Sequence, residues 1–87
     1  MTWQVGWTSP AVRDMARLPL KAAGAIAAYV DGRLVENPER HSKPLVGALA
    51  DYRSARNGDY RILFRLTEQP PTIWIARVDH RAHVYRP

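Results

Sequence analysis

Arginines dominate the second half of the chain, and their type and number could support chemistry on a polyanion. From residue 53 to the C-terminus, seven cations stand against three carboxylates, whereas residues 1–52 hold six cations and five carboxylates. All seven cations are arginine, whose planar fork of donors matches phosphate. We therefore predict a polyanion-binding face, the alternative being a basic surface without a ligand. The arginines are Arg53, Arg56, Arg61, Arg65, Arg77, Arg81 and Arg86.

Other reactive groups are sparse. The chain has no cysteine, and its carboxylates and histidines show no spacing typical of a metal site, so we expect neither a metal nor another cofactor. His41 and Lys43 lie in a long polar connection, residues 39–49, and could lie beside a bound phosphate. The alternative interpretation is an exposed loop with ordinary polar residues.

A predicted hairpin strand positions two of the arginines. Asn57-Gly58 is a strong short-range hairpin signal, and we expect a type I′ turn in which both residues have positive φ. Behind the turn, the two-residue period of a strand puts Arg61 and Arg65 on one face. The opposite face is apolar and is expected to pack in the core. It carries Tyr60, Ile62, Phe64 and Leu66.

Two helices are predicted before this hairpin. Ser9 would cap the first helix, because its side chain can accept a hydrogen bond from a free amide. Val12 and Ala16 would lie on the buried side of this helix, and Asp14 would face water. The second helix would run from about residue 20 to residue 35.

The remaining segments indicate strands. Residues 3–7 and 51–56 precede the hairpin strand, and residues 82–87 could form a last short strand. Residues 72–78 are apolar on both faces, as expected at the centre of a covered sheet, and Trp74 is expected in the core, the alternative being a ring on which a base stacks. The order β-α-α-β-β-β-β predicts an α+β fold, in which two N-terminal helices pack on a mostly antiparallel sheet of about four to five strands.

The length of 87 residues indicates a single domain, residues 1–87. No apolar run is long enough to span a membrane, which needs roughly 18 or more residues. The N-terminus lacks the basic start and apolar stretch of a secretory signal. We therefore expect a cytoplasmic protein.

Two segments of the chain resemble the RelE branch of the RelE/ParE toxin superfamily. The first is YRSARNGDYR, residues 52–61, and the second is VDHRAHVY, residues 78–85. Their most specific parts are the G-D-Y-R core and the H-R-x-x-V-Y ending. Both motifs occur in the expected order, and the resemblance covers nearly the whole chain.

The resemblance implies the toxin of a type II toxin–antitoxin system. Toxins of this branch are ribosome-dependent endoribonucleases that cut mRNA in the decoding site and so inhibit translation. The cleavage is metal-independent and proceeds by attack of the ribose 2′-OH. The implied partners are the ribosome, mRNA and a cognate acidic, RelB-like antitoxin, with which the toxin forms a hetero-oligomer.

The resemblance also implies the catalytic residues. Arg61 and Arg81 would clamp the scissile phosphate and stabilise the charge of its transition state. Tyr85 would stack on the substrate or act as general base. His80 could transfer protons, since histidine titrates near neutral pH. The alternative for His80 is a residue that hydrogen-bonds the chain at the end of a strand.

The remaining cations are expected to bind RNA. Arg53 and Arg56 stand where the best-known members of the branch carry lysines, and arginine binds charge better than it moves protons. Arg65 and Lys43 would hold RNA backbone. Arg77 is expected to form a weak surface ion pair with a nearby carboxylate of its own strand or of the preceding turn.

Two other functions remain open at this stage. The ParE branch has the same fold but poisons DNA gyrase and lacks the RNA-cutting residues. The ending from His80 to Tyr85 argues against that branch. The other alternative is a catalytically inactive member that binds RNA or an antitoxin.

Overall fold

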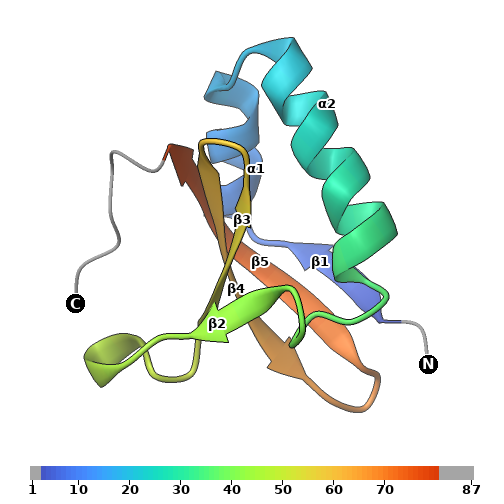
Figure 1. Ribbon diagram of the computed structural model, residues 1–87, viewed down its shortest axis with the longest axis vertical. Helices are drawn as coiled ribbons and strands as arrows, with labels where there is room; N and C mark the ends of the chain where they lie inside the picture. The colour runs from blue at the N-terminus through green and yellow to red at the C-terminus, as the bar shows by residue number, and fades with distance from the viewer. Residues whose placement is uncertain (1–2, 81–87) are drawn as a thin grey trace.

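The structure, a computed structural model, describes residues 3–80 of the chain. Its elements are β1 (Gln4–Trp7), α1 (Ser9–Arg17), α2 (Leu20–Tyr29), β2 (Ser42–Pro44), β3 (Arg53–Asn57), β4 (Tyr60–Thr67) and β5 (Thr72–His80). The strands form one five-stranded sheet in the order β1-β5-β4-β3-β2, with the helices packed on it (Figure 1). β1 runs parallel to β5, and the other neighbouring strands are antiparallel. The predicted α+β fold is confirmed.

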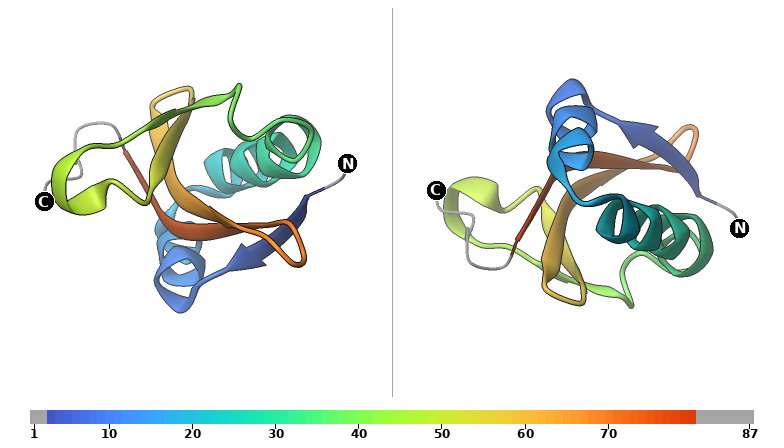
Figure 2. Two further views of the ribbon diagram at one scale, coloured as in Figure 1. Left: turned by 90° about the horizontal axis from the view of Figure 1, so that it is seen from below. Right: turned by 90° about the horizontal axis from the view of Figure 1, so that it is seen from above.

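The core lies against the face of β4 that the sequence alternation identified. Ile62 and Phe64 of β4 are fully buried, and so are Ile26 and Val30 from α2 and the π-helical turn that continues it. Seen from below and from above, the twisted sheet curves around α2 (Figure 2). Full burial of an apolar side chain of this size stabilises the fold by about 1.5–3 kcal/mol. Within residues 3–80, no helix is long and apolar enough to cross a membrane.

The hairpin between β3 and β4 forms where the sequence predicted it, but with a different turn. Asn57 pairs with Tyr60, so the two loop residues are Gly58 and Asp59. Gly58 has a φ of 58°, whereas neither Asn57 nor Asp59 has a positive φ. Positive φ at the first loop position alone is the pattern of a type II′ turn, in which glycine is preferred at that position. The predicted type I′ turn at Asn57-Gly58 is therefore wrong.

The connection over residues 39–49 contains a strand that the sequence did not indicate. β2 has only three residues, too few to show an alternating pattern, and it pairs antiparallel with β3. Tyr29 of α2 holds this connection, because its hydroxyl donates a hydrogen bond to the carbonyl of His41 at 3.5 Å. Burial raises the pKa of Tyr29, so the hydroxyl keeps its proton and remains a donor.

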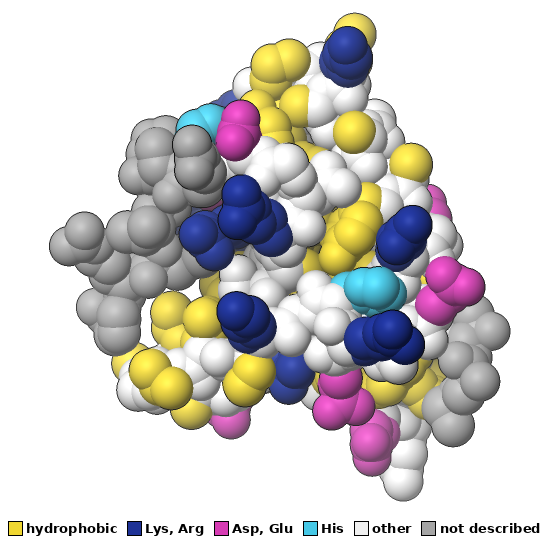
Figure 3. Space-filling view, viewed as in Figure 1, with side chains coloured by type: hydrophobic (Ala, Val, Ile, Leu, Met, Phe, Trp, Pro, Cys, Tyr) yellow, Lys and Arg dark blue, Asp and Glu magenta, His cyan; other side chains and the backbone are white. Residues whose placement is uncertain are grey.

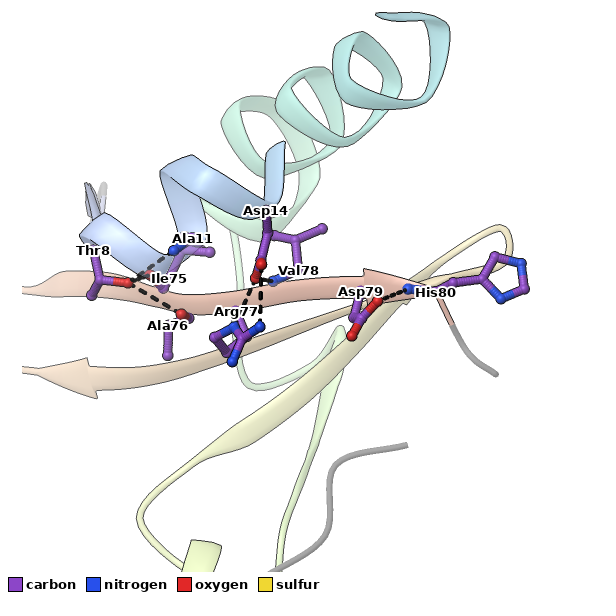
Figure 4. A network of polar contacts seen from close by, with 9 residues as sticks. All are labelled: Thr8, Ala11, Asp14, Ile75, Ala76, Arg77, Val78, Asp79 and His80. Carbon is purple, nitrogen blue, oxygen red and sulfur yellow. Dashed lines mark hydrogen bonds and ion pairs between the residues drawn. The ribbon is translucent and has the colours of Figure 1, made fainter. Parts of the chain in front are cut away.

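The edge of β5 is covered in two different ways along its length. β1 pairs with the first half of β5 and ends at Trp7, opposite Ile75. Beyond that point α1 lies along the strand and supplies side-chain hydrogen bonds (Figure 4). The Thr8 hydroxyl contacts the carbonyls of Ile75 and Ala76 at 2.9 and 3.1 Å. Thr8 also caps α1 by accepting from the Ala11 amide, so the prediction that Ser9 is the cap is wrong.

Asp14 completes this edge and is buried, contrary to the prediction that it faces water. Its Oδ2 accepts from the Val78 amide at 2.9 Å and from Nε of Arg77 at 2.8 Å. Because α1 turns Ala11 and Asp14 toward β5, Val12 and Ala16 are exposed, and the prediction for those two residues is also wrong. Arg77 pairs with Asp14, which lies far away in the sequence, and not with a nearby carboxylate.

The pKa of Asp14 follows from these contacts. Burial alone would raise the pKa, but the hydrogen bonds from Arg77 and Val78 and the charges of Arg77 and Arg17 outweigh it and lower the pKa below its ordinary value. A carboxyl group with a lowered pKa stabilises the fold above its unfolded pKa, about 3.9 for aspartate, and this stabilisation is lost as the pH falls through the folded value.

Asp14→Asn should therefore destabilise the protein at neutral pH and have little effect in acid. We expect a loss of about 1–2 kcal/mol in the free energy of unfolding at pH 7, because the charge of a buried, hydrogen-bonded acceptor is removed while its shape is kept. Chemical denaturation between pH 3 and pH 7 measures this difference. Asp31→Asn, at an exposed aspartate, is the matched control. An equal loss at both ends of the pH range would contradict the role of the charge.

Candidate nucleic-acid interface

The sheet face opposite the core, here called the outer face, carries the cations that the sequence placed on alternate positions. Arg56 of β3 lies directly opposite Arg61 of β4. On the neighbouring strand β2, Lys43 pairs with Ser54, which shares the face of Arg56. Lysine and arginine side chains are spread over the side of the molecule seen in Figure 3. The structure therefore brings together three of the predicted RNA-contacting residues, one from each strand.

These residues line one open pocket of about 630 Å³, here called the arginine pocket. Its lining includes Lys43, Arg56 and Arg61, together with Arg40 and His41, and no carboxylate is among the described residues that line it. Like charges directly opposite each other on a sheet are destabilising. A bound phosphate between Arg56 and Arg61 would remove this repulsion and gain charge-assisted hydrogen bonds.

Arg61 is the most enclosed of the three cations. It is partly buried, whereas Arg56 and Lys43 are exposed. On the other side of β4, Arg61 pairs with Asp79 of β5. Arg61 thus lies between a cation and an anion in the same row of the sheet, and its Nε atom is buried. Arg56 is held at the rim, where its Nε donates to the Gly58 carbonyl at 3.2 Å.

Arg53 lies on the other face of β3. It pairs with Phe64, whose side chain belongs to the core. Its Nε donates to the Ser42 hydroxyl at 2.7 Å, and one terminal nitrogen reaches the carbonyl of Glu39 at 3.2 Å. The guanidinium of Arg53 therefore holds the start of β2 in place. A contact between Arg53 and RNA stays a prediction.

His80 is separated from the arginine pocket. It pairs with Tyr60, on the side of β4 that faces the core, and the two rings meet edge to face with centroids 5.5 Å apart. Its amide donates to the Asp79 carboxylate at 2.8 Å (Figure 4). Of the two histidines within residues 3–80, His41 lines the arginine pocket. The sequence indicated His41 only as a phosphate neighbour, because the pairing of β2 with β3 could not be foreseen.

Arg65 belongs to a second pocket on the outer face. It lies four positions beyond Arg61 along β4, which corresponds to about 13 Å between the two Cα atoms at ~3.3 Å per residue. This pocket has a volume of about 280 Å³ and is lined by Thr8, Tyr52, Arg65, Trp74 and Ala76. Trp74 is 41 % exposed, so the prediction that it lies in the core is wrong. At Trp74, β5 is buried on one face only, because none of the described helices covers the outer face there.

The other predicted site residues are not described by the structure. Arg81 and Tyr85 lie outside residues 3–80, as does the predicted strand over residues 82–87. Their roles stay predictions. Among the described residues, no group of three or more histidines and carboxylates could hold a metal ion.

Comparisons with known proteins identify the relatives of this chain. The family model described as "ParE toxin of type II toxin-antitoxin system, parDE" matches residues 5–85. The chain is 42 % identical over 86 residues to toxin RelG of Mycobacterium tuberculosis, covering 99 % of each chain. It is 38 % identical over 84 residues to toxin RelE of the same organism, covering 97 % of this chain and 87 % of that one.

The structure also resembles a solved one. The toxin–antitoxin complex RelBE2 from Mycobacterium tuberculosis contains a chain that matches with a TM-score of 0.89 and 40 % sequence identity. The match covers 93 % of this chain and all of that chain, 100 %.

The salt dependence of oligonucleotide binding tests whether the cations of the arginine pocket contact phosphates. We expect Arg56→Gln to weaken binding of a single-stranded oligonucleotide and to reduce the slope of log K against log salt by about 0.7, the value for one phosphate contact on a single strand. Fluorescence anisotropy with a labelled 2′-O-methyl hexanucleotide, which cannot be cleaved by 2′-OH attack, gives both quantities. Arg33→Gln removes the same charge from an exposed helical position and serves as control. Equal slopes for the two variants would mean that Arg56 contacts no phosphate.

Proposed function

The chain belongs to the ParE toxin family of type II toxin–antitoxin systems, in its RelE branch, and on that premise we propose that it is a ribosome-dependent endoribonuclease that cleaves mRNA in the decoding site. The observation that carries this proposal is the arginine pocket, in which Arg56 and Arg61 lie directly opposite each other and no carboxylate is present. Such a pocket suits a phosphate whose negative charge increases during a reaction.

Cleavage would proceed by attack of the ribose 2′-OH on the adjacent phosphate. The oxygen–phosphorus bond to the 2′-oxygen forms as the bond to the 5′-oxygen breaks, and the charge of the phosphorane in between needs stabilising. Arg61, which is partly buried, and Arg56, which is exposed, would donate hydrogen bonds to the phosphorane oxygens. Removing one donor of this kind typically costs about 10²–10³ in rate.

Arginine cannot supply the proton transfers, because it stays protonated at physiological pH. His41 lines the same pocket, and histidine is suited to exchange protons near neutral pH. We assign to His41 the transfer of a proton from the 2′-OH or to the departing 5′-oxygen. Arg81 and Tyr85 keep the roles that the family resemblance implies, the former as a second phosphate clamp and the latter as a stacking residue or general base.

The partners follow from the same premise. The solved relative from Mycobacterium tuberculosis is a toxin–antitoxin complex, which supports a hetero-oligomer with a cognate antitoxin for this chain. We expect the antitoxin to be acidic and RelB-like, since opposite charges accelerate association with a chain of net charge +5. Action on the ribosome and on mRNA would place the toxin in the cytoplasm.

The proposed activity is tested by in vitro translation, with mRNA 5′ ends mapped by primer extension. We expect new mRNA 5′ ends within codons, and these ends should form only when ribosomes are present. They should disappear with Arg61→Ala and persist with the control Arg33→Ala. An mRNA with a 2′-deoxynucleotide at the mapped position should stay intact, because it lacks the attacking hydroxyl. Intact mRNA with the wild-type protein would reject the endoribonuclease, and inhibition of DNA supercoiling in the same preparation would indicate the gyrase-inhibiting function instead.

The two histidines provide an internal comparison. His41→Gln should slow cleavage by about 10²–10⁴, the usual range for a general acid or base. His80→Gln should cleave at nearly the wild-type rate, because its ring lies against Tyr60 on the core side of β4. The reverse result, with only His80→Gln inactive, would show that the arginine pocket lacks its acid–base group.

A further inference from the structure

The second pocket on the outer face is not used by the proposed reaction. It is lined by Thr8, Tyr52, Arg65, Trp74 and Ala76, and like the arginine pocket it contains no carboxylate. Arg65 and Trp74 are directly opposite each other on β4 and β5. An exposed indole beside an exposed guanidinium is an unusual pair to leave in water, because large aromatic side chains usually gain from burial.

The indole of Trp74 is held in a fixed orientation. Its Nε1 donates to the Thr67 hydroxyl at 3.1 Å. One side of the ring lies on Gly6 of β1, so closely that a Cβ atom at that position would come within 2.4 Å of the ring. The glycine therefore lets the indole lie against the backbone of β1. Trp74 as a whole is still 41 % exposed, and it lines the pocket.

The guanidinium of Arg65 is available to a ligand. Arg65 is exposed, and it makes no hydrogen bond or ion pair with the described part of the chain. The residue has an apolar neighbour in Trp74 and a polar one in Tyr52. A ligand that uses both the indole and the guanidinium must combine a flat ring with a negative charge, and a nucleotide has both.

We propose that Trp74 and Arg65 form a second RNA subsite, in which one base stacks on the indole and its phosphate contacts the guanidinium. This inference rests on the proposed function, since it extends the path of the same strand beyond the arginine pocket. Arg61 and Arg65 are about 13 Å apart, a span of roughly four stacked nucleotides at ~3.4 Å each. The subsite therefore holds a nucleotide upstream or downstream of the cleaved bond and adds affinity without taking part in the chemistry.

A protein partner is a weaker explanation for this pocket. An acidic side chain of an antitoxin could pair with Arg65, but it would leave the indole uncovered. Base stacking on an aromatic side chain uses the whole exposed ring surface and is tolerant of sequence. The subsite is accordingly expected to bind any base.

The test compares oligonucleotides that can and cannot bridge the two pockets. Labelled 2′-O-methyl RNAs of two and six nucleotides are titrated with the full chain and followed by fluorescence anisotropy. The wild type should bind the hexanucleotide more tightly than the dinucleotide by about 5- to 150-fold, the usual effect of stacking one base. Trp74→Leu should remove this advantage, and Trp74→Phe should keep part of it. Leu20→Ala is the control. Leu20 lies elsewhere on the surface and is 92 % exposed, so its substitution should have no effect on binding.

If Trp74→Leu disturbs the fold, Arg65→Gln still tests the subsite, because the Arg65 side chain is exposed and makes no contact that the fold needs. It should reduce the salt slope for the hexanucleotide by about 0.7. If Trp74→Leu and Arg65→Gln both bound the hexanucleotide as tightly as the wild type does, the subsite would be overturned and the proposed function would stand. If these two variants instead lost affinity only for a glutamate-rich peptide, the pocket would belong to a protein partner. Failure of the wild type to bind either RNA would also overturn the subsite, whereas the proposed cleavage, which takes place on the ribosome, is rejected only by intact mRNA in the translation assay.

Discussion

The alternation of side chains along β4 is the constraint on which both the fold and the site depend. Ile62 and Phe64 must face the core, and a shift of one residue would exchange the two faces of the strand. The register is therefore fixed, and with it Arg61 lies opposite Arg56, while Arg65 lies opposite Trp74. A strand at the middle of the sheet holds these cations at a fixed spacing, which a mobile loop would not do.

The parts of the fold that were predictable are those with a local pattern. The two-residue period of β4 identified Ile62 and Phe64 as core residues, although Leu63 on the opposite face is buried as well, and Asn57-Gly58 marked the hairpin to within one residue. The second helix was predicted from about residue 20 to residue 35, and α2 with the π-helical turn that continues it spans residues 20–34. These signals are local because the side chains that alternate are neighbours in the sequence. The pairing of Arg56 with Arg61 was not among these predictions, because a two-residue turn at Asn57-Gly58 would put Arg56 opposite Asp59, whereas the observed turn at Gly58-Asp59 puts it opposite Arg61.

The parts that were not predictable depend on contacts between distant residues. Asp14 looks like a solvent-facing residue of α1, and it is buried only because β1 ends at Trp7 and leaves the Val78 amide without a strand partner. The position of His41 depends in the same way on the pairing of β2 with β3. Trp74 appeared to belong to the core because tryptophan usually does, whereas here Gly6 provides a flat backbone surface for the ring.

The most direct test of the account is the single-turnover rate of mRNA cleavage on programmed ribosomes at saturating protein. Under these conditions weaker binding no longer limits the rate, so only stabilisation of the transition state is measured. The account predicts that Arg61→Ala cleaves about 10²–10³ times more slowly than Arg33→Ala, which should match the wild type. Equal rates for Arg61→Ala and the wild type would mean that the arginine pocket binds RNA without contributing to its cleavage.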